Sequence, residues 1–270
     1  MGNRIEDSFA MLRQSSRTGL VAYTTAGFPD LEGSAEIIHE LGKVADAVEI
    51  GVPCANPFAD GPIIRRSHEL ALARFVSPEL VLNMVRELRR ANFVKPIVLM
   101  LYLELVQRFG PARLFSKALD VGVDAVLIPD LRRLMDLGRL PVAVQNTPLI
   151  PFVSPDIGED MLAELLRKPS SFIYMAAGSG RSGGALISNK ALAAGVARIR
   201  DITDFPVAMG IGIKTPQDAR RVAQFSDAVV IGTAVVDLIF SHIGPDGHLI
   251  DGWRPSLRRF LASIIEAIND

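Results

Sequence analysis

The sequence of 270 residues has little cysteine, few aromatic residues and no excess of charge of either sign. Its one cysteine, Cys54, can form neither an internal disulfide nor a multi-cysteine zinc site, and a single thiol suits a reducing compartment. The 29 Lys and Arg residues nearly balance the 30 Asp and Glu residues, so no overall field attracts nucleic acid or an anionic membrane. Any anionic ligand must therefore be bound by a local site.

Long hydrophobic runs are also missing. The most apolar stretch, 96–106, is interrupted by Glu104 and is far shorter than the roughly 20 residues needed to span a bilayer. Residues 1–17 mix acids and bases with apolar residues and contain no signal-peptide core. We therefore expect a cytoplasmic protein that binds neither membrane nor nucleic acid.

The sequence does contain enough apolar material for a large core, at 49% hydrophobic and 22% charged residues. Eight short runs rich in Val, Ile and Ala alternate with longer helical patterns, as βα units do around a parallel sheet. Their near-continuous apolarity is typical of strands covered on both faces. The runs are 20–25, 45–50, 96–101, 125–128, 149–153, 172–176, 206–209 and 228–231.

Eight such units in an unbroken chain predict an α/β fold, a single (β/α)8 TIM barrel over residues 1–270. We expect an N-terminal helix at about 3–15 and a C-terminal helix at about 256–268, from their helical patterns.

Proline and capping residues predict where individual helices begin. Ser77 and Thr215 are each followed by proline, a pair that favours the start of a helix. Gly138 and Pro141 interrupt the segment 131–148, which predicts two short helical pieces in place of one helix.

Two glycine-containing loops follow the seventh and eighth runs, at 210–214 and 232–234. In a TIM barrel the loops at the carboxyl ends of the strands carry function, and those after strands seven and eight often bind phosphate. Glycine lets the backbone approach a phosphate, and the following helix offers unpaired N–H groups. Either loop could also be an ordinary strand-to-helix turn, but their shared position favours the phosphate site.

Two carboxylates lie near the end of the second run. Glu49 interrupts an apolar strand, where burial would raise its pKa toward neutrality, and Asp60 follows in a loop bounded by prolines. Two carboxyls at one rim can divide acid and base roles. The residues alone leave two structural alternatives open, namely that Glu49 pairs with a buried Lys or Arg and that Asp60 caps the next helix.

The segment 178–183 matches the glycine spacing of a dinucleotide-binding loop. The predicted helix starts too late for that function and Asp201 lies at its end, so a mobile lid with glycine hinges is the better interpretation. Cys54 has no partner base that would make it a nucleophile. The four histidines lack metal-ligand spacing, which favours surface or packing roles: His39, His68, His242 and His248.

The segments 49–53 and 56–62 together resemble the tryptophan synthase alpha subunit family, whose pattern is E-[LVI]-G-[IV]-P-[FY]-S-D-P-x-A-D-G-P. The resemblance covers roughly residues 8–242. Further matching segments occur in the expected order, at 25–30, 99–102, 129–131, 172–174, 210–213 and 232–234.

This resemblance implies cleavage of indole-3-glycerol phosphate to indole and glyceraldehyde 3-phosphate without a cofactor, as a step of tryptophan biosynthesis. It implies that Glu49 is the acid and base and that Asp60 accepts the indole N–H. The other residues that it assigns to substrate binding are Tyr102, Tyr174, Ser182, Gly183, Gly184, Gly212, Gly232 and Thr233. The family passes the indole to a pyridoxal-phosphate-dependent beta subunit, which is the partner expected here.

The sequence departs from the family pattern in segments that face the beta subunit in the family, and in the sixth loop. In the second loop, Cys54, Ala55 and Asn56 replace an aromatic residue, Ser and Asp, and Arg65 replaces Gln. Glu104 stands at the Asn position of the family's Tyr-x-Asn. In the sixth loop, Arg181 and Ser182 replace Val and Thr. Two alternatives therefore stay open, a stand-alone lyase that releases indole to another pathway and a non-catalytic subunit that activates a beta-type partner.

Overall fold

The computed structural model describes residues 3–131, 148–167, 170–178, 187–210 and 212–270, and the following account concerns these residues. Parallel strands form a sheet in the order β5-β4-β3-β2-β1-β9-β8-β7-β6. The strands are β1 (Gly19–Thr25), β2 (Ala47–Gly51), β3 (Ile97–Met100), β4 (Ala125–Leu127), β5 (Leu149–Ile150), β6 (Phe152–Val153), β7 (Ile173–Ala176), β8 (Val207–Gly210) and β9 (Ala228–Ile231).

The fifth predicted run is divided at Pro151 into β5 and β6, which are the two ends of the sheet. Proline has no backbone N–H, so it interrupts the ladder of hydrogen bonds. Its carbonyl still accepts the N–H of Tyr174 at 2.9 Å, and β5 pairs with β4 while β6 pairs with β7. The continuous segment 149–153 therefore closes the barrel, and the predicted TIM-barrel fold is confirmed.

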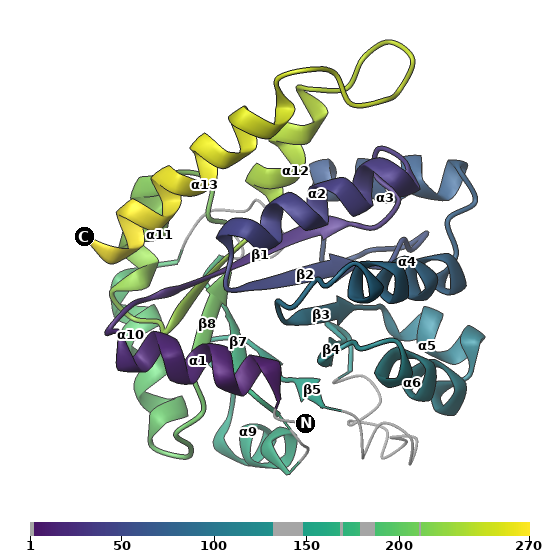
Figure 1. Cartoon of the computed structure of the whole chain (residues 1–270). Helices are drawn as coiled ribbons and strands as arrows, with labels where there is room; N and C mark the ends of the chain where they lie inside the picture. The colour runs from purple at the N-terminus through teal and green to yellow at the C-terminus, as the bar shows by residue number, and fades with distance from the viewer. Residues whose placement is uncertain (1–2, 132–147, 168–169, 179–186, 211) are drawn as a thin grey trace.

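Helices cover the outside of the sheet (Figure 1). Before the segment 149–153 in the sequence, the helices are α1 (Arg4–Gln14), α2 (Leu31–Val44), α3 (Pro62–Ala73), α4 (Pro78–Arg90), α5 (Leu103–Phe109) and α6 (Pro111–Asp120). After it they are α9 (Glu159–Leu166), α10 (Asn189–Arg200), α11 (Pro216–Ala223), α12 (Thr233–Phe240) and α13 (Trp253–Asn269). No helix among those described is both long and apolar enough to cross a membrane.

The predicted helix starts at two capping residues are confirmed. The Ser77 side chain accepts the backbone N–H of Leu80 at the start of α4. Thr215 and Asp218 form a reciprocal capping box at the start of α11, so both unpaired donors of that turn are satisfied. The helical pieces expected within 131–148 fall almost wholly on 132–147, outside the described residues.

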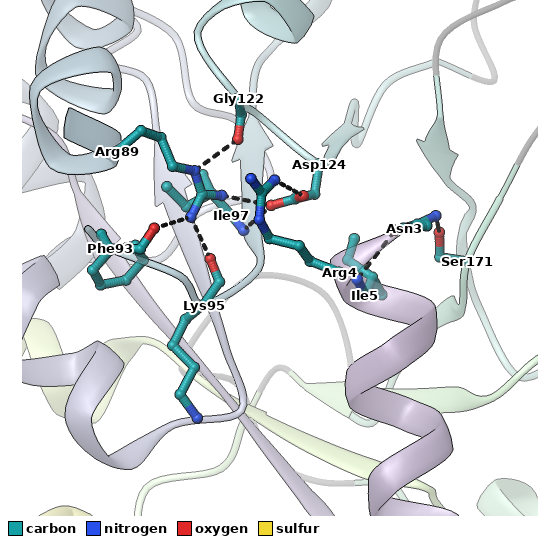
Figure 2. A network of polar contacts seen from close by, with 10 residues as sticks. All are labelled: Asn3, Arg4, Ile5, Arg89, Phe93, Lys95, Ile97, Gly122, Asp124 and Ser171. Carbon is teal, nitrogen blue, oxygen red and sulfur yellow. Dashed lines mark hydrogen bonds and ion pairs between the residues drawn. The ribbon is translucent and has the colours of Figure 1, made fainter. Parts of the chain in front are cut away.

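The amino end of the barrel is closed by α1 and by a network around Asp124 (Figure 2). The Asp124 carboxylate accepts Arg4 at 2.8 Å, Arg89 at 2.6 Å and the backbone N–H of Ile97 at 2.8 Å. Arg89 also donates to three backbone carbonyls, those of Phe93, Lys95 and Gly122. In a barrel of this kind, the carboxyl ends of the strands, opposite this network, are the place for a ligand.

Candidate active site

A pocket with about 560 Å³ of empty space, part of it open to solvent, lies at the carboxyl ends of the strands. Six of the residues predicted from sequence line it together: Glu49, Asp60, Tyr174, Gly212, Gly232 and Thr233. Its walls are otherwise mainly apolar, from residues that include Ile64, Met100, Leu127 and Phe152. One side can therefore hold a flat apolar group, while carboxyls and glycine backbone supply the polar contacts.

Glu49 is an isolated carboxyl inside the barrel. It lies on β2 in register with Tyr23 of β1 and Val98 of β3, and only 4% of the residue is exposed. Burial, with a smaller contribution from the charge of Asp60, raises the pKa of Glu49 to about 8. No Lys or Arg in the described part of the chain pairs with it, which argues against the ion-pair alternative. At neutral pH the group therefore carries a proton that it can give and later recover.

Asp60 is held by hydrogen bonds of its own. Its carboxylate Oδ2 accepts the hydroxyl of Tyr102 at 2.7 Å, while its backbone carbonyl accepts Arg65 Nε at 2.8 Å. The N-cap of α3 is Gly61, and no side chain caps that helix, so the capping alternative for Asp60 is wrong. Burial and the charge of Asp60 raise the pKa of Tyr102, which keeps its phenol protonated as the donor. The Tyr102 hydroxyl therefore reaches the pocket through its contact with Asp60, and its role toward the substrate stays a prediction.

Two residues at this site were missed by the sequence analysis. Tyr23 lines the pocket, and His68 Nε2 lies 3.2 Å from its hydroxyl and 3.9 Å from Asp60 Oδ2. The backbone N–H of Cys54 donates to His68 Nδ1 at 2.9 Å, which leaves the ring proton on Nε2 in the neutral form. Burial lowers the pKa of His68 to about 4, so the ring is neutral at physiological pH.

Helical spacing could have found His68, for which we predicted a surface or packing role. Ile64, Ser67, His68 and Ala71 are the buried residues of α3, and they follow the spacing of one helix face. His68 lies on that face near the loop that carries Asp60. Tyr23 lies on β1 two residues before Thr25, the last residue of the strand. Because successive side chains of a strand alternate between its two faces, Tyr23 and Thr25 point to the same face.

Glycines on two strands make room for the tyrosines. A Cβ atom at Gly51 would lie 2.2 Å from the Tyr23 hydroxyl, and one at Gly210 would lie 2.0 Å from the Tyr174 hydroxyl. Tyr174 also packs against Phe152, with ring centroids 5.2 Å apart. Each phenol can therefore lie close to the neighbouring strand.

The glycine end of the pocket has the features of an anion site. Gly212 has a positive φ of 87°, and Gly232 is the N-cap of α12 without a side-chain cap. The first bond within α12 runs from Val236 N–H to the Gly232 carbonyl, so the N–H groups before it have no partner in the described structure. These donors and the helix dipole favour a phosphate.

Other predicted positions lie outside the described residues. They are Arg181, Ser182, Gly183 and Gly184 of the sixth loop. The helix that follows, α10, begins at Asn189 after the N-cap Ser188, and Asp201 is its C-cap. This late start and the place of Asp201 agree with the argument against a dinucleotide-binding loop.

The remaining side chains do not suggest other chemistry. Burial raises the pKa of the Cys54 thiol, which disfavours its use as a nucleophile. Within the described ranges, no group of His, Cys, Asp and Glu side chains is placed to hold a metal ion. Ala55, Asn56 and Glu104, which depart from the family pattern, are exposed.

Comparison with known proteins gives a consistent result. The sequence profile described as tryptophan synthase alpha chain matches residues 9–249. The tryptophan synthase alpha chain of Paraburkholderia phytofirmans is 33% identical over 270 residues, covering 99% of this chain and 97% of that protein.

Solved structures agree over the whole length. Tryptophan synthase subunit alpha of Legionella pneumophila superposes with a TM-score of 0.82 at 27% identity, covering 99% of both chains. A chain of the Mycobacterium tuberculosis tryptophan synthase superposes with a TM-score of 0.82 at 26% identity, covering 100% of both chains.

Proposed function

Because the chain belongs to the tryptophan synthase alpha chain family, we propose that it cleaves indole-3-glycerol phosphate to indole and glyceraldehyde 3-phosphate without a cofactor. The observation that carries this proposal is Glu49, a buried carboxyl with a raised pKa in the same pocket as Asp60 and an anion site. Cleavage of a carbon–carbon bond next to an indole ring needs proton transfer and a group that stabilises charge on the ring, and the anion site matches the phosphate of the substrate.

Glu49 performs both proton transfers. Its carboxylic acid delivers a proton to indole C3, the carbon whose bond to the glycerol chain breaks. The carboxylate that results removes the proton of the adjacent hydroxyl, whose oxygen becomes the aldehyde of glyceraldehyde 3-phosphate. The proton given at the start is thus recovered, and a pKa of about 8 suits a group that must act in both directions.

Asp60 stabilises the charge that develops on the ring. Protonation at C3 places positive charge at the indole nitrogen, and the carboxylate accepts its N–H. The hydrogen bond from Tyr102 fixes the direction of the Asp60 carboxylate at 2.7 Å, so little reorganisation is needed during the reaction. Tyr174 and Phe152 supply aromatic surface for the indole ring.

The phosphate lies at the glycine end. The backbone N–H groups of Gly212, Gly232 and Thr233 hold it at the start of α12. Ser182, Gly183 and Gly184, from the segment outside the described residues, complete this site by their resemblance to the family.

The proposed partner is a pyridoxal-phosphate-dependent tryptophan synthase beta subunit, which consumes the indole, and the proposed location is the cytoplasm. Exposed residues in the loop before Asp60 and in α5, such as Asn56 and Glu104, occupy the positions that face this subunit in the family. Their departure from the family pattern makes dependence on the partner a matter for direct measurement.

A steady-state assay of indole formation from indole-3-glycerol phosphate tests the proposal, with the chain alone and with a beta subunit. We expect indole and glyceraldehyde 3-phosphate in equal amounts and weak turnover that rises with the correct partner. Strong turnover alone, unchanged by a beta subunit, would favour the stand-alone lyase. Absence of indole under both conditions, with activation of the beta subunit, would favour the non-catalytic alternative.

A further inference from the structure

The loop that carries Asp60 is fastened to α3 at both of its ends. At its start, the backbone N–H of Cys54 donates to His68 Nδ1 at 2.9 Å. At its end, Arg65 Nε donates to the Asp60 carbonyl at 2.8 Å and Arg65 Nη2 donates to the Phe58 carbonyl at 3.3 Å. Arg65 and His68 are three residues apart on a helix, so they lie on neighbouring positions of one face.

The loop forms neither helix nor strand between β2 and α3. Within it, Phe58 N–H bonds to the Asn56 carbonyl and Asp60 N–H bonds to the Pro57 carbonyl. Holding such a segment in one conformation costs roughly 1 to 2 kcal/mol per residue in backbone entropy. The contacts from α3 offset part of this cost, and they form within the chain itself, with no partner or substrate present.

The chemistry of Arg65 suits this task. Its guanidinium is planar and permanently charged, and it presents several N–H donors in a fixed fork. Two of these donors reach carbonyls two residues apart, and no acidic side chain in the described part of the chain forms an ion pair with it. Arg65 therefore holds the backbone at Phe58 and Asp60, while Tyr102 contacts the Asp60 carboxylate.

Building on the function proposed above, we propose that Arg65 and His68 are positioning residues that hold the Asp60 loop in its working conformation without help from a partner subunit. They touch the loop backbone and leave the reacting atoms to Glu49 and Asp60. The chain then orders this part of its site by itself. Partner binding therefore contributes less to the placement of Asp60 than it would if the contacts from Arg65 and His68 were absent.

The first experiment compares Arg65→Ala with Arg66→Ala. Arg66 is exposed on the same helix and stacks on the Phe240 ring at 4.8 Å, away from the loop. We expect Arg65→Ala to lower kcat without partner by about 10-fold or more while KM changes less than about threefold, because the phosphate is bound elsewhere. Millimolar guanidinium should restore much of the loss, and Arg66→Ala should behave like the wild type.

Hydrogen exchange of the free protein provides a readout that needs no substrate. Arg65→Ala should speed exchange in 54–60 by about 10-fold or more and leave the strands unchanged. His68→Leu should release the Cys54 amide, whereas His68→Asn keeps an acceptor near Nδ1 and should retain more of its protection. Unchanged exchange of the loop in both Arg65→Ala and His68→Leu would overturn the proposal.

The two proposals fail in different ways. If the wild type forms no indole with or without a beta subunit, the proposed reaction is wrong. The exchange measurements then still decide whether Arg65 and His68 hold the Asp60 loop. If the wild type is active and Arg65→Ala matches it in kcat and loop exchange, the positioning role is wrong. A loss of kcat that guanidinium does not restore, with faster exchange throughout the barrel, would likewise overturn it in favour of a general structural role.

Discussion

Two carboxyls that are almost equally buried have different surroundings in this pocket. Asp60 accepts a hydrogen bond from Tyr102, which favours its charged form. Glu49 has no hydrogen-bond partner among the described residues, and burial raises its pKa to about 8. In the proposed mechanism, this difference in surroundings allows Glu49 to transfer protons while Asp60 remains an acceptor.

Substitution of either carboxyl should lower turnover without unfolding the protein. We expect Glu49→Gln and Asp60→Asn each to reduce kcat by about 100-fold or more, since positioned proton transfer typically contributes about 10² to 10⁴. Glu49→Gln should be the worse, because it removes both proton transfers. Indole formation under steady-state conditions measures this, with circular dichroism as the folding control. Near-wild-type turnover in Glu49→Gln would exclude the mechanism.

Glu49 also makes stability depend on pH. The folded chain keeps its proton up to a pKa of about 8, whereas the unfolded carboxyl releases it near 4.5, so stability falls as pH rises through this window. Glu49→Gln cannot ionise. The free energy of unfolding of Glu49→Gln, relative to that of the wild type, should therefore increase between pH 5 and pH 8 by on the order of a few kcal/mol.

Urea unfolding of both proteins across this range measures the difference. The lowered pKa of His68, about 4, has the opposite effect, because stability is lost as pH falls from 6.5 toward that value. This contribution cancels when variant and wild type are compared at the same pH. A difference that stays constant from pH 5 to pH 8 would contradict the raised pKa of Glu49.

At the scale of elements, the start of α12 and the turn after β8 form the proposed anion site. Gly212→Val should raise KM for indole-3-glycerol phosphate more than it lowers kcat, because a side chain blocks the approach of phosphate to the backbone. Gly110→Val is the matched control. Gly110 has a φ of 88° against 87° at Gly212, and open space surrounds it.

Both variants place a side chain at a positive φ, so both should lose stability. Only Gly212→Val should change KM, and binding of glycerol phosphate, measured by calorimetry, should weaken in parallel. Equal effects of the two substitutions on KM would remove Gly212 from the phosphate site.

At the scale of the whole molecule, the Asp124 network fastens the closed end of the barrel while the chemistry occupies the other end (Figure 2). Asp124→Asn should lower the free energy of unfolding by about 3 kcal/mol, because Arg89 then keeps a charge in a largely buried site without its partner. Glu87→Gln is the control, since its ion pair with Arg90 is exposed and should contribute less than about 1 kcal/mol.

Chemical unfolding measures both changes, and kcat at 25 °C should stay unchanged in each variant. A large loss of kcat in folded Asp124→Asn would mean that the two ends of the barrel are coupled. An equal loss of stability in both variants would mean that burial of Asp124 adds nothing.

Much of the fold could be predicted from the sequence, because strands covered on both faces are apolar throughout. The eight runs correspond to the strands, and capping residues such as Ser77 and Thr215 located the helix starts. The division of the fifth run at Pro151 was missed, since its apolar composition conceals the lost hydrogen bond. The carboxyl ends of the strands indicated where to search, and this placed Glu49 and Asp60 in one pocket.

The supporting groups of the site were harder to predict. The contacts of Tyr102, Arg65 and His68 with the Asp60 loop depend on side-chain directions and on backbone carbonyls, which no residue pattern records. The resemblance indicated Tyr102 as a substrate contact, whereas the structure directs its hydroxyl to Asp60. A single sequence can reveal chemically reactive residues more readily than the groups that hold them.

The interruption at Pro151 also bears on self-association. An unpaired strand edge can template the addition of a strand from another molecule, which is one route to aggregation. Here the two sheet ends, β5 and β6, pair over only two residues each, and Leu149, Ile150 and Val153 are buried. The closed barrel therefore presents no long exposed edge in the segment 149–153, and cross-molecular β-pairing there must wait until the barrel opens. Turbidity on heating should accordingly follow the loss of tertiary structure and not precede it.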